Sequence, residues 1–311
     1  MIIGRVAQIW RYPVKSMAGD PLDSSFIGAA GVAGDRAWAV RDDVAGEIRS
    51  GRTWPILLQC SAQYRQEPDA AIPHVDLTLP DDTTTSSDRT DVDLRISTLV
   101  GTKASLWPLQ PATDKAHYRR ARRGAAVAAA IGRWRLGRRS LQTIMRAARL
   151  DVGVRRAFGR EPGEPLPDFA DLPAELFEFV SPPGTYFDVS PIHLLTTSSL
   201  AAMSYANPAA DWNVRRFRPN ILIDTGPAPA LVEPGWCGRR IRIGRVTLQC
   251  EIPAPRCAMP TYPQRALRAD ASMLRTIVRD GHQQLGIYAT VVSAGQIALD
   301  DPVEWEYGTA D

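Results

Sequence analysis

The pattern of apolar and polar positions predicts β-strands separated by turns over the first part of the chain. Short segments alternate between apolar and polar residues, and turn-rich pieces such as Asp81–Asp88 separate them. This alternation predicts an antiparallel sheet or a small barrel with one buried face. The expected strands are Ile2–Trp10, Arg36–Arg41, Val75–Leu79, Val92–Ile96 and Ala104–Leu109.

The middle of the chain is rich in Ala and Arg. Apolar residues recur there at helical spacing after the possible cap Ser140, at Leu141, Ile144, Met145 and Ala148. Prolines become frequent from Pro162 to Pro183, and such residues end helices and stiffen connections. We therefore predict a short helical insertion and a domain boundary near Ser181.

The remainder again predicts mostly strands. Ile192–Leu195 is apolar enough for either a buried strand or the start of a helix. The other expected elements are a helix over Ser198–Tyr205, a strand over Asn220–Asp224, a hairpin over Ile241–Ile252 around Gly244, a helix over Ala271–Gln284, and strands over Tyr288–Val292 and Val303–Trp305. The predicted fold class is α+β and mostly β, with two β-barrel-like units (1–109 and 181–311) joined by a helical, Arg-rich insertion and linker (110–180).

Composition and charge add one asymmetry to this picture. The 311 residues are 44% hydrophobic and 23% charged, as in ordinary globular proteins. The net charge is +3, yet Lys115–Arg160 holds fourteen Lys and Arg residues and one acid, Asp151. Such a segment attracts phosphate-bearing cofactors, acidic proteins or nucleic acid. Aromatic residues are sparse there and no nucleic-acid-binding module fits, so we favour a solvated helical surface that docks an acidic redox partner.

The sequence predicts a soluble cytoplasmic protein with no membrane segment. The longest apolar run, Ala125–Ile131, is too short to span a bilayer, and no signal-peptide pattern follows Met1. Four cysteines spread over a long chain are expected to be reduced thiols.

Several common sites are disfavoured by the absence of their motifs. The histidines are isolated and no C-x-x-C occurs, which disfavours structural zinc, and no iron–sulfur spacing is found. No P-loop, G-x-G-x-x-G or G-x-S-x-G is present, although a dispersed Ser-His-Asp triad stays open.

Cys257 is the cysteine best placed for chemistry. It follows Pro253-Ala254-Pro255-Arg256, so restricted backbone and a permanent cation stand beside the sulfur. A neighbouring cation favours the thiolate, which is the metal-binding form. The alternative is an inert, buried cysteine, the interpretation that suits Cys60, Cys237 and Cys250 better.

Four further segments carry side chains suited to an anionic ligand. Each also has an ordinary structural interpretation, as a solvated strand end, a turn or a loop. An ammonium with a hydroxyl, and paired guanidiniums, suit phosphate oxygens. The segments are Arg11-Tyr12-Pro13-Val14-Lys15-Ser16, Gly34-Asp35-Arg36, Asp188-Val189-Ser190-Pro191 and Arg216-Phe217-Arg218-Pro219-Asn220.

Taken together with Leu285-Gly286-Ile287-Tyr288, these motifs occur in an order and spacing that resembles the MOSC family. Within it, the chain is most similar to the branch that contains the mitochondrial amidoxime-reducing component and its bacterial relatives. The resemblance covers nearly the whole chain. It implies an N-terminal MOSC β-barrel domain to about Leu109 and a MOSC domain from about Ser181.

The resemblance implies a pyranopterin molybdenum cofactor whose metal is bound by the thiolate of Cys257. Soft sulfur ligands suit such a metal. Residues implied to contact the cofactor or line its pocket are Lys15, Ser16, Arg36, Asp188, Val189, Ser190, Arg218, Asn220, Arg256 and Tyr288. Pro255 and Ala258-Met259-Pro260 depart from the small polar residues usual around this cysteine, which leaves the substrate's shape open.

The implied activity is reduction of N-hydroxylated compounds with electrons from a separate ferredoxin- or cytochrome-type protein. The protein would supply placement and electrostatics for the cofactor's chemistry. The alternative is a carrier of sulfur or of the molybdenum cofactor that does not turn over a substrate of its own. MOSC domains also occur at the end of molybdenum cofactor sulfurases. The pyridoxal-phosphate domain of those enzymes has no counterpart in this sequence, so pyridoxal phosphate is associated with the family alone.

Overall fold

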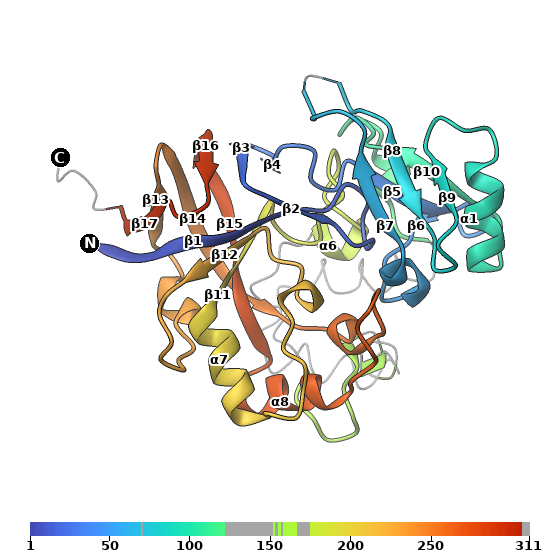
Figure 1. Cartoon of the computed structure of the whole chain (residues 1–311). Coiled ribbons are helices and arrows are strands. Elements are labelled where there is room, and N and C mark those ends of the chain that lie inside the picture. Colours follow the sequence, from blue (N-terminus) through green and yellow to red (C-terminus); the bar gives the residue numbers. More distant parts are fainter. Residues whose placement is uncertain (70, 122–151, 153–154, 157, 167–174, 307–311) are drawn as a thin grey trace.

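A computed structural model of the chain describes residues 1–69, 71–121, 152, 155–156, 158–166 and 175–306 (Figure 1). Strands dominate it, so the prediction of a mostly β protein is confirmed. In Figure 1 a barrel lies on the left with helices α7 and α8 below it, and smaller sheets with helix α1 lie on the right.

The barrel is a closed ring of seven strands. Strand β1 closes it by pairing with β17 on one side and with β12 on the other. Closure leaves no unpaired sheet edge in the ring. Around the ring the strands are β12 (Ile221–Asp224), β11 (Ile192–Thr196), β15 (Gln284–Ser293), β14 (Val246–Pro255), β13 (Arg240–Ile243), β17 (Pro302–Trp305) and β1 (Ile2–Arg11).

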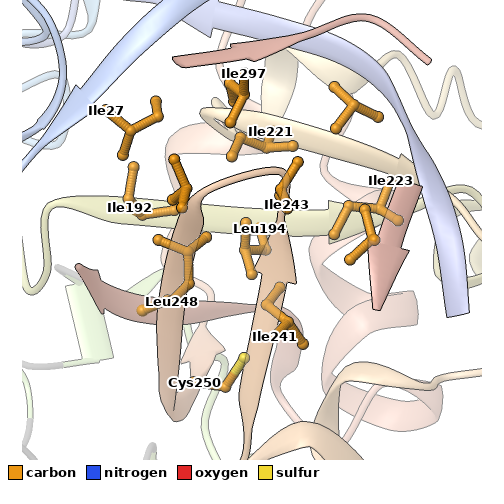
Figure 2. Packing of buried hydrophobic residues seen from close by; sticks show 14 of the residues in the cluster. Ile27, Ile192, Leu194, Ile221, Ile223, Ile241, Ile243, Leu248, Cys250 and Ile297 are labelled. Carbon is orange, nitrogen blue, oxygen red and sulfur yellow. The ribbon is translucent and has the colours of Figure 1, made fainter. Parts of the chain in front are cut away.

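Alternate side chains of these strands fill the barrel with branched apolar residues (Figure 2). Ile192, Leu194, Ile241, Ile243 and Leu248 are all fully buried there. A small sheet adds three more residues to the same core: Ile27, Val32 and Ile297. Its strands are β3 (Ser24–Gly28), β4 (Gly31–Val32) and β16 (Gly295–Ala298), while β2 (Asp20–Leu22) pairs with β1.

The rest of the N-terminal part packs around a second core. Val14, Trp38, Leu57, Leu77 and Ile96 are among its buried members. Two three-stranded sheets form it, in the orders β10-β5-β6 and β7-β8-β9. The elements are β5 (Trp38–Asp42), β6 (Glu47–Ile48), the 3₁₀ turn η1 (Pro55–Gln59), β7 (Ser61–Tyr64), β8 (Val75–Thr78), β9 (Thr84–Ser86), α1 (Val92–Val100) and β10 (Ala104–Pro108).

One predicted strand is wrong. Val92–Ile96 begins helix α1, because its short alternation is also the start of a helical repeat. Val92 and Ile96 are buried one turn apart, and Leu99 packs on the same core one turn later. Gly101 ends the helix in the left-handed conformation, with φ +72°.

The barrel also contains a parallel pair that the sequence did not predict. Helix α7 begins where β11 ends, and the chain returns through β12 parallel to β11. The open choice for Ile192–Leu195 is thus resolved as a strand. Helices α7 and α8 cover a third apolar cluster, which includes Leu195 and Phe217. The remaining elements here are α7 (Thr197–Ala206), η2 (Val214–Arg216), η3 (Glu233–Trp236), η4 (Met259–Thr261) and α8 (Ser272–Asp280).

The predicted basic insertion lies mostly outside the described residues, including the helix expected after Ser140. The described parts of the insertion include the short helices α2 (Lys115–Tyr118) and α6 (Glu175–Glu178). Among the described residues, no helix is both long and apolar enough to cross a membrane.

Shortening a β1 side chain inside the barrel tests the closure. Ile9 is fully buried and faces the barrel core, whereas Ile2 on the same strand is 55% exposed. We expect Ile9→Ala to lower the free energy of unfolding by about 2–5 kcal/mol and Ile2→Ala by less than about 0.5 kcal/mol. Urea unfolding followed by tryptophan fluorescence measures both. Equal losses of unfolding free energy in Ile9→Ala and Ile2→Ala would contradict the placement of Ile9 inside the barrel.

Candidate functional site

A pocket lies between the barrel and the N-terminal part and encloses about 670 Å³ of space between protein atoms, part of it open to solvent. Ten of the eleven predicted site residues line it: Lys15, Ser16, Arg36, Asp188, Ser190, Arg218, Asn220, Arg256, Cys257 and Tyr288. Val189 is the exception, since its half-buried side chain does not line the pocket.

The chain just after β1 brings Lys15 and Ser16 to Arg36. The backbone N–H of Arg36 donates to the Tyr12 carbonyl at 2.7 Å, and that of Lys15 donates to the Trp38 carbonyl at 2.8 Å. These bonds hold the two segments side by side. The Ser16 hydroxyl in turn accepts from the Gly51 N–H at 2.8 Å.

The buried Lys15 forms an ion pair at the pocket wall with Asp188, whose side chain is 48% exposed. Its Nζ donates to Asp188 Oδ1 at 2.6 Å and to the Tyr186 carbonyl at 2.7 Å. Burial lowers the pKa of Lys15, and the Asp188 carboxylate opposes that shift. Burial would raise the pKa of Asp188, but Lys15 and nearby guanidiniums hold it well below its usual range. Asp188 is therefore ionised at neutral pH.

Arg36 and Arg218 stack on the Tyr12 ring, with guanidinium carbons 5.0 Å and 4.1 Å from its centroid. Arg36 also pairs with Asp35, whose carboxylate raises the pKa of Arg36 against the effect of burial. Burial and the neighbouring Arg36 lower the pKa of Arg218 to about 10, so it keeps its charge at pH 7. Arg218 Nη1 donates to the Met17 carbonyl. Its Nη2 is buried without a hydrogen-bond partner among the described residues.

Three pocket residues adopt the left-handed backbone region that non-glycine residues rarely occupy. Their φ angles are +71° for Ser16, +50° for Arg36 and +55° for Arg218. Each belongs to a different segment of the chain. Such conformations cost free energy and persist only where surrounding contacts enforce them, which is typical of binding sites.

Cys257 follows β14 in a loop that buried arginines hold in place. Arg256 donates from Nη2 to the Phe217 carbonyl at 2.7 Å, and Arg160 Nη2 donates to the Arg256 carbonyl at 3.0 Å. Arg216 is also buried and donates to the Pro260 carbonyl at 3.2 Å. The Cys257 side chain itself is half-buried and lines the pocket.

His193 is a pocket residue that the sequence analysis missed. Arg256 Nη1 lies 3.3 Å from His193 Nε2, so Nε2 must accept and the ring proton sits on Nδ1, facing the Arg218 carbonyl at 3.4 Å. Burial and Arg256 lower the pKa of His193 well below 6.5, and the ring is neutral. Gly286 leaves room for it, because a Cβ there would lie 2.5 Å from Nε2.

Asn220 and Tyr288 complete the wall beside His193. Asn220 is engaged within the barrel, since its Oδ1 accepts from the His193 N–H at 3.1 Å. Burial raises the pKa of Tyr288 to about 12, so its hydroxyl is protonated at neutral pH. The other lining residues absent from the prediction are Phe187, Arg216, Phe217, Pro255, Met259 and Pro260. Of these, Arg216 and Phe217 lie inside the predicted arginine motif, and Pro255, Met259 and Pro260 flank the predicted Cys257.

The pocket carries a clear excess of positive charge. Five cationic side chains and one carboxylate, that of Asp188, line it. Lys15, Arg36 and Arg216 lie within ion-pair distance of Asp188, Asp35 and Asp211. Arg218 and Arg256 instead contact backbone carbonyls and aromatic rings, which do not neutralise charge. The pocket is therefore suited to an anion that carries several charges.

The neutral state of His193 predicts a pH effect on stability. Its folded pKa is lowered, so protonation favours the unfolded chain and stability falls as the pH drops below about 6.5. We expect His193→Gln, whose amide oxygen can still accept from Arg256, to lose less stability between pH 7 and pH 5 than the wild type. The exposed His74→Gln should keep the wild-type dependence. Urea unfolding between pH 7 and pH 5 measures the free energy of unfolding of each variant. If that free energy changes with pH in His193→Gln as it does in the wild type, His193 is not the group responsible.

Comparison with curated proteins finds molybdenum cofactor sulfurases. That of Drosophila grimshawi is 34% identical over 117 residues, which are 35% of this chain and 14% of the relative. That of Drosophila melanogaster is 37% identical over 99 residues, or 31% of this chain and 12% of the relative. The chain thus matches only a small part of the length of these relatives.

Solved structures give more distant matches. YiiM from Escherichia coli has a TM-score of 0.30 at 14% identity, covering 39% of this chain and 57% of that one. The YUAD protein from Bacillus subtilis has a TM-score of 0.31 at 22% identity, covering 40% and 69%. These likenesses are too weak to add to the assignment.

Two family models match the chain and together cover most of it. The model of the MOSC N-terminal beta barrel domain matches residues 3–116, and that of the MOSC domain matches residues 183–304. The two ranges supply the two walls of the pocket. The chain belongs to the MOSC domain family.

Proposed function

We propose that the pocket binds a molybdenum cofactor, with the Cys257 thiolate as the protein's ligand to the metal. The observation that carries this proposal is the meeting of one accessible thiol with five buried or half-buried cations in a single pocket. Family membership and the sulfurase relatives point to the same cofactor.

The donor set fits a metal that arrives with ligands of its own. Within the described part of the chain, no group of three or more His, Cys, Asp or Glu residues could hold a metal ion. A pyranopterin supplies sulfur ligands and a phosphate, so it needs from the protein a soft thiolate and a cationic surround. Both are available around Cys257.

Residues from both walls of the pocket would bind the cofactor. Lys15, Ser16 and Arg36 form one side, and Arg218 and Arg256 form the other. The unpartnered Nη2 of Arg218 offers a donor to an oxygen of the bound anion. Asn220 would act indirectly, because its amide already fixes His193.

The activity we propose is reduction of an N-hydroxylated compound to the corresponding amine or amidine. The reaction consumes two electrons and two protons and releases the hydroxyl oxygen as water. The bound cofactor would supply the oxygen-accepting and electron-transferring chemistry. Tyr288, protonated at neutral pH, offers a hydrogen bond to a substrate oxygen. Electrons would come from a separate ferredoxin- or cytochrome-type protein, as the resemblance to the branch of the amidoxime-reducing component implies.

A carrier of sulfur or of the cofactor is the second candidate. The curated relatives favour it, because those matched here are named as molybdenum cofactor sulfurases. As a carrier, the chain would bind the cofactor or a Cys257 persulfide without turning over N-hydroxylated substrates. Both candidate functions use the same pocket residues. Turnover of an N-hydroxylated substrate therefore distinguishes the reductase from the carrier.

Removing the Cys257 thiol should remove the metal. We expect the wild type, produced in a host that makes the cofactor, to contain near-stoichiometric molybdenum and pterin, and Cys257→Ala to lose most of the metal. Cys237→Ala, which removes an exposed thiol, is the matched control and should keep both. Metal by mass spectrometry and pterin by fluorescence measure this. Equal molybdenum content in Cys257→Ala and Cys237→Ala would show that Cys257 is not the metal ligand.

Turnover then separates the two candidate functions. With reduced methyl viologen in place of the electron donor, the loaded wild type should convert an aromatic amidoxime to the amidine, and Cys257→Ala should not. Chromatography of the amidine measures the rate. A fully loaded wild type without turnover would favour the carrier.

Arg218 should be needed for cofactor retention. Loss of a charge-assisted hydrogen bond costs about 1.5–3 kcal/mol, or about ten- to hundredfold in affinity. We expect Arg218→Gln to weaken cofactor binding by this factor, whereas Arg245→Gln at the exposed β13–β14 turn should not change it. Pterin retention after dialysis reports the difference. Full retention by Arg218→Gln would show that this guanidinium does not hold the cofactor.

A further inference from the structure

The end of the basic insertion packs directly on the loop that carries Cys257. Gly159 makes the closest approach, since a Cβ there would lie 2.9 Å from the Cβ of Ala258, the residue after the cysteine, and 2.8 Å from Cδ2 of Leu274 on α8. The φ angle of Gly159, +61°, is also one that residues with side chains rarely adopt. The backbone of residues 158–166 therefore lies against the cysteine loop at a distance that only glycine allows.

Helix α8 holds this segment in place. Arg275 on the helix donates to the Gly159 carbonyl and forms an ion pair with Glu164. Arg155, just before the segment, donates from Nη1 to the carbonyls of Glu161 at 2.9 Å and of Glu164 at 2.8 Å. These contacts fix the chain on both sides of residue 160.

Arg160 extends from this segment to the residue that precedes Cys257, and it is only 5% exposed. Its Nη2 donates to the Arg256 carbonyl at 3.0 Å, and its Nε donates to Gln283 Oε1 at 3.4 Å. The Gln283 carbonyl in turn accepts from the Arg256 N–H at 2.9 Å. Arg160 and Gln283 thus hold both polar backbone groups of Arg256, including the carbonyl of the peptide bond to Cys257.

Arg160 also brings a positive charge that has no ion-pair partner in the described part of the chain. The nearby carboxylates of Glu161 and Glu164 form their ion pairs with Arg275 instead. Burial lowers the pKa of Arg160, and Glu164 and a negatively charged Cys257 sulfur oppose that shift. Because attraction between two charges acts on both, Arg160 attracts a thiolate at Cys257.

We propose that Arg160 is a positioning residue for Cys257, which fixes the peptide before the thiol and places a positive charge beside it. Arg160 does not line the pocket, so it acts on the cysteine loop rather than on a bound molecule. The inference deepens the proposed function and rests on it, because Cys257 is the proposed ligand to the metal. It gives residues 158–166 a role in the site in addition to the docking role predicted for the basic insertion.

Reaction of Cys257 with charged and uncharged thiol reagents tests the charge at the sulfur without any cofactor. In the full-length Cys237→Ala chain, purified without cofactor, Cys257 is the one cysteine that is not buried. Dithiobis(nitrobenzoate) is a dianion and dithiodipyridine is uncharged, so the ratio of their reaction rates at one pH reports the local positive charge. We expect Arg160→Gln to lower this ratio by about threefold or more, Arg160→Lys to restore most of it, and the exposed Arg245→Gln to leave it unchanged.

The ratio separates positioning by a charge from a general loosening of the loop, which would change both rates together. An unchanged ratio in Arg160→Gln overturns the proposal. Equally lowered ratios in Arg160→Gln and Arg160→Lys overturn it too, because the effect would then not depend on charge. If urea unfolding shows that Arg160→Gln does not fold, Arg275→Gln replaces it, since it releases Gly159 from α8. An unchanged ratio in Arg275→Gln then overturns the proposal.

Molybdenum retention after dialysis tests the link to the metal. In a host that makes the cofactor, we expect Arg160→Gln to bind the cofactor about tenfold more weakly than the wild type and Arg160→Lys to retain more of it than Arg160→Gln. Full retention by Arg160→Gln overturns the positioning role. A wild type without molybdenum would instead contradict the cofactor proposal, and the ratio of thiol reaction rates would still decide whether Arg160 acts on Cys257.

Discussion

Closure of the barrel by β1 is the constraint on which the rest of the structure depends. The strand pairs with β12 and β17, which come from the other end of the sequence. It then runs directly into the segment that carries Lys15 and Ser16. The pairing that completes the barrel therefore also delivers the N-terminal wall of the pocket to the wall that holds Cys257. Fold and site share this one strand.

The pocket keeps a net positive charge because two of its five cations, Arg218 and Arg256, are held by groups that do not cancel it. Arg216 and Arg256 donate to backbone carbonyls, and Arg218 stacks on the Tyr12 ring. Such contacts offset part of the cost of burial. Lys15 alone has a carboxylate partner that lines the pocket, Asp188. An anion with several charges that enters the pocket thus meets arranged cationic donors, of which Arg218 and Arg256 have no carboxylate partner among the described residues.

The same arrangement explains why His193 matters without being an acid or base at neutral pH. Its neutral ring accepts from Arg256 and its backbone is fixed by Asn220. It therefore orients the guanidinium beside Cys257. Unusual backbone angles at Ser16, Arg36 and Arg218 add to this preorganisation, because they leave each side chain few alternatives.

The sequence by itself determined the mostly β architecture, most element positions and the chemistry of the pocket residues. These follow from local periodicity and from motifs whose order is visible along the chain, as with the hairpin at Gly244 and Arg256-Cys257. Local pattern failed at Val92–Ile96, because five alternating residues fit both a strand and the first turns of a helix.

Only the tertiary structure decided which distant residues meet. The closure of the barrel by β1 and the burial of His193 against Arg256 both depend on contacts between residues far apart in sequence. No local pattern encodes such contacts. They arise when packing brings separate segments together and leaves particular donors paired or unpaired.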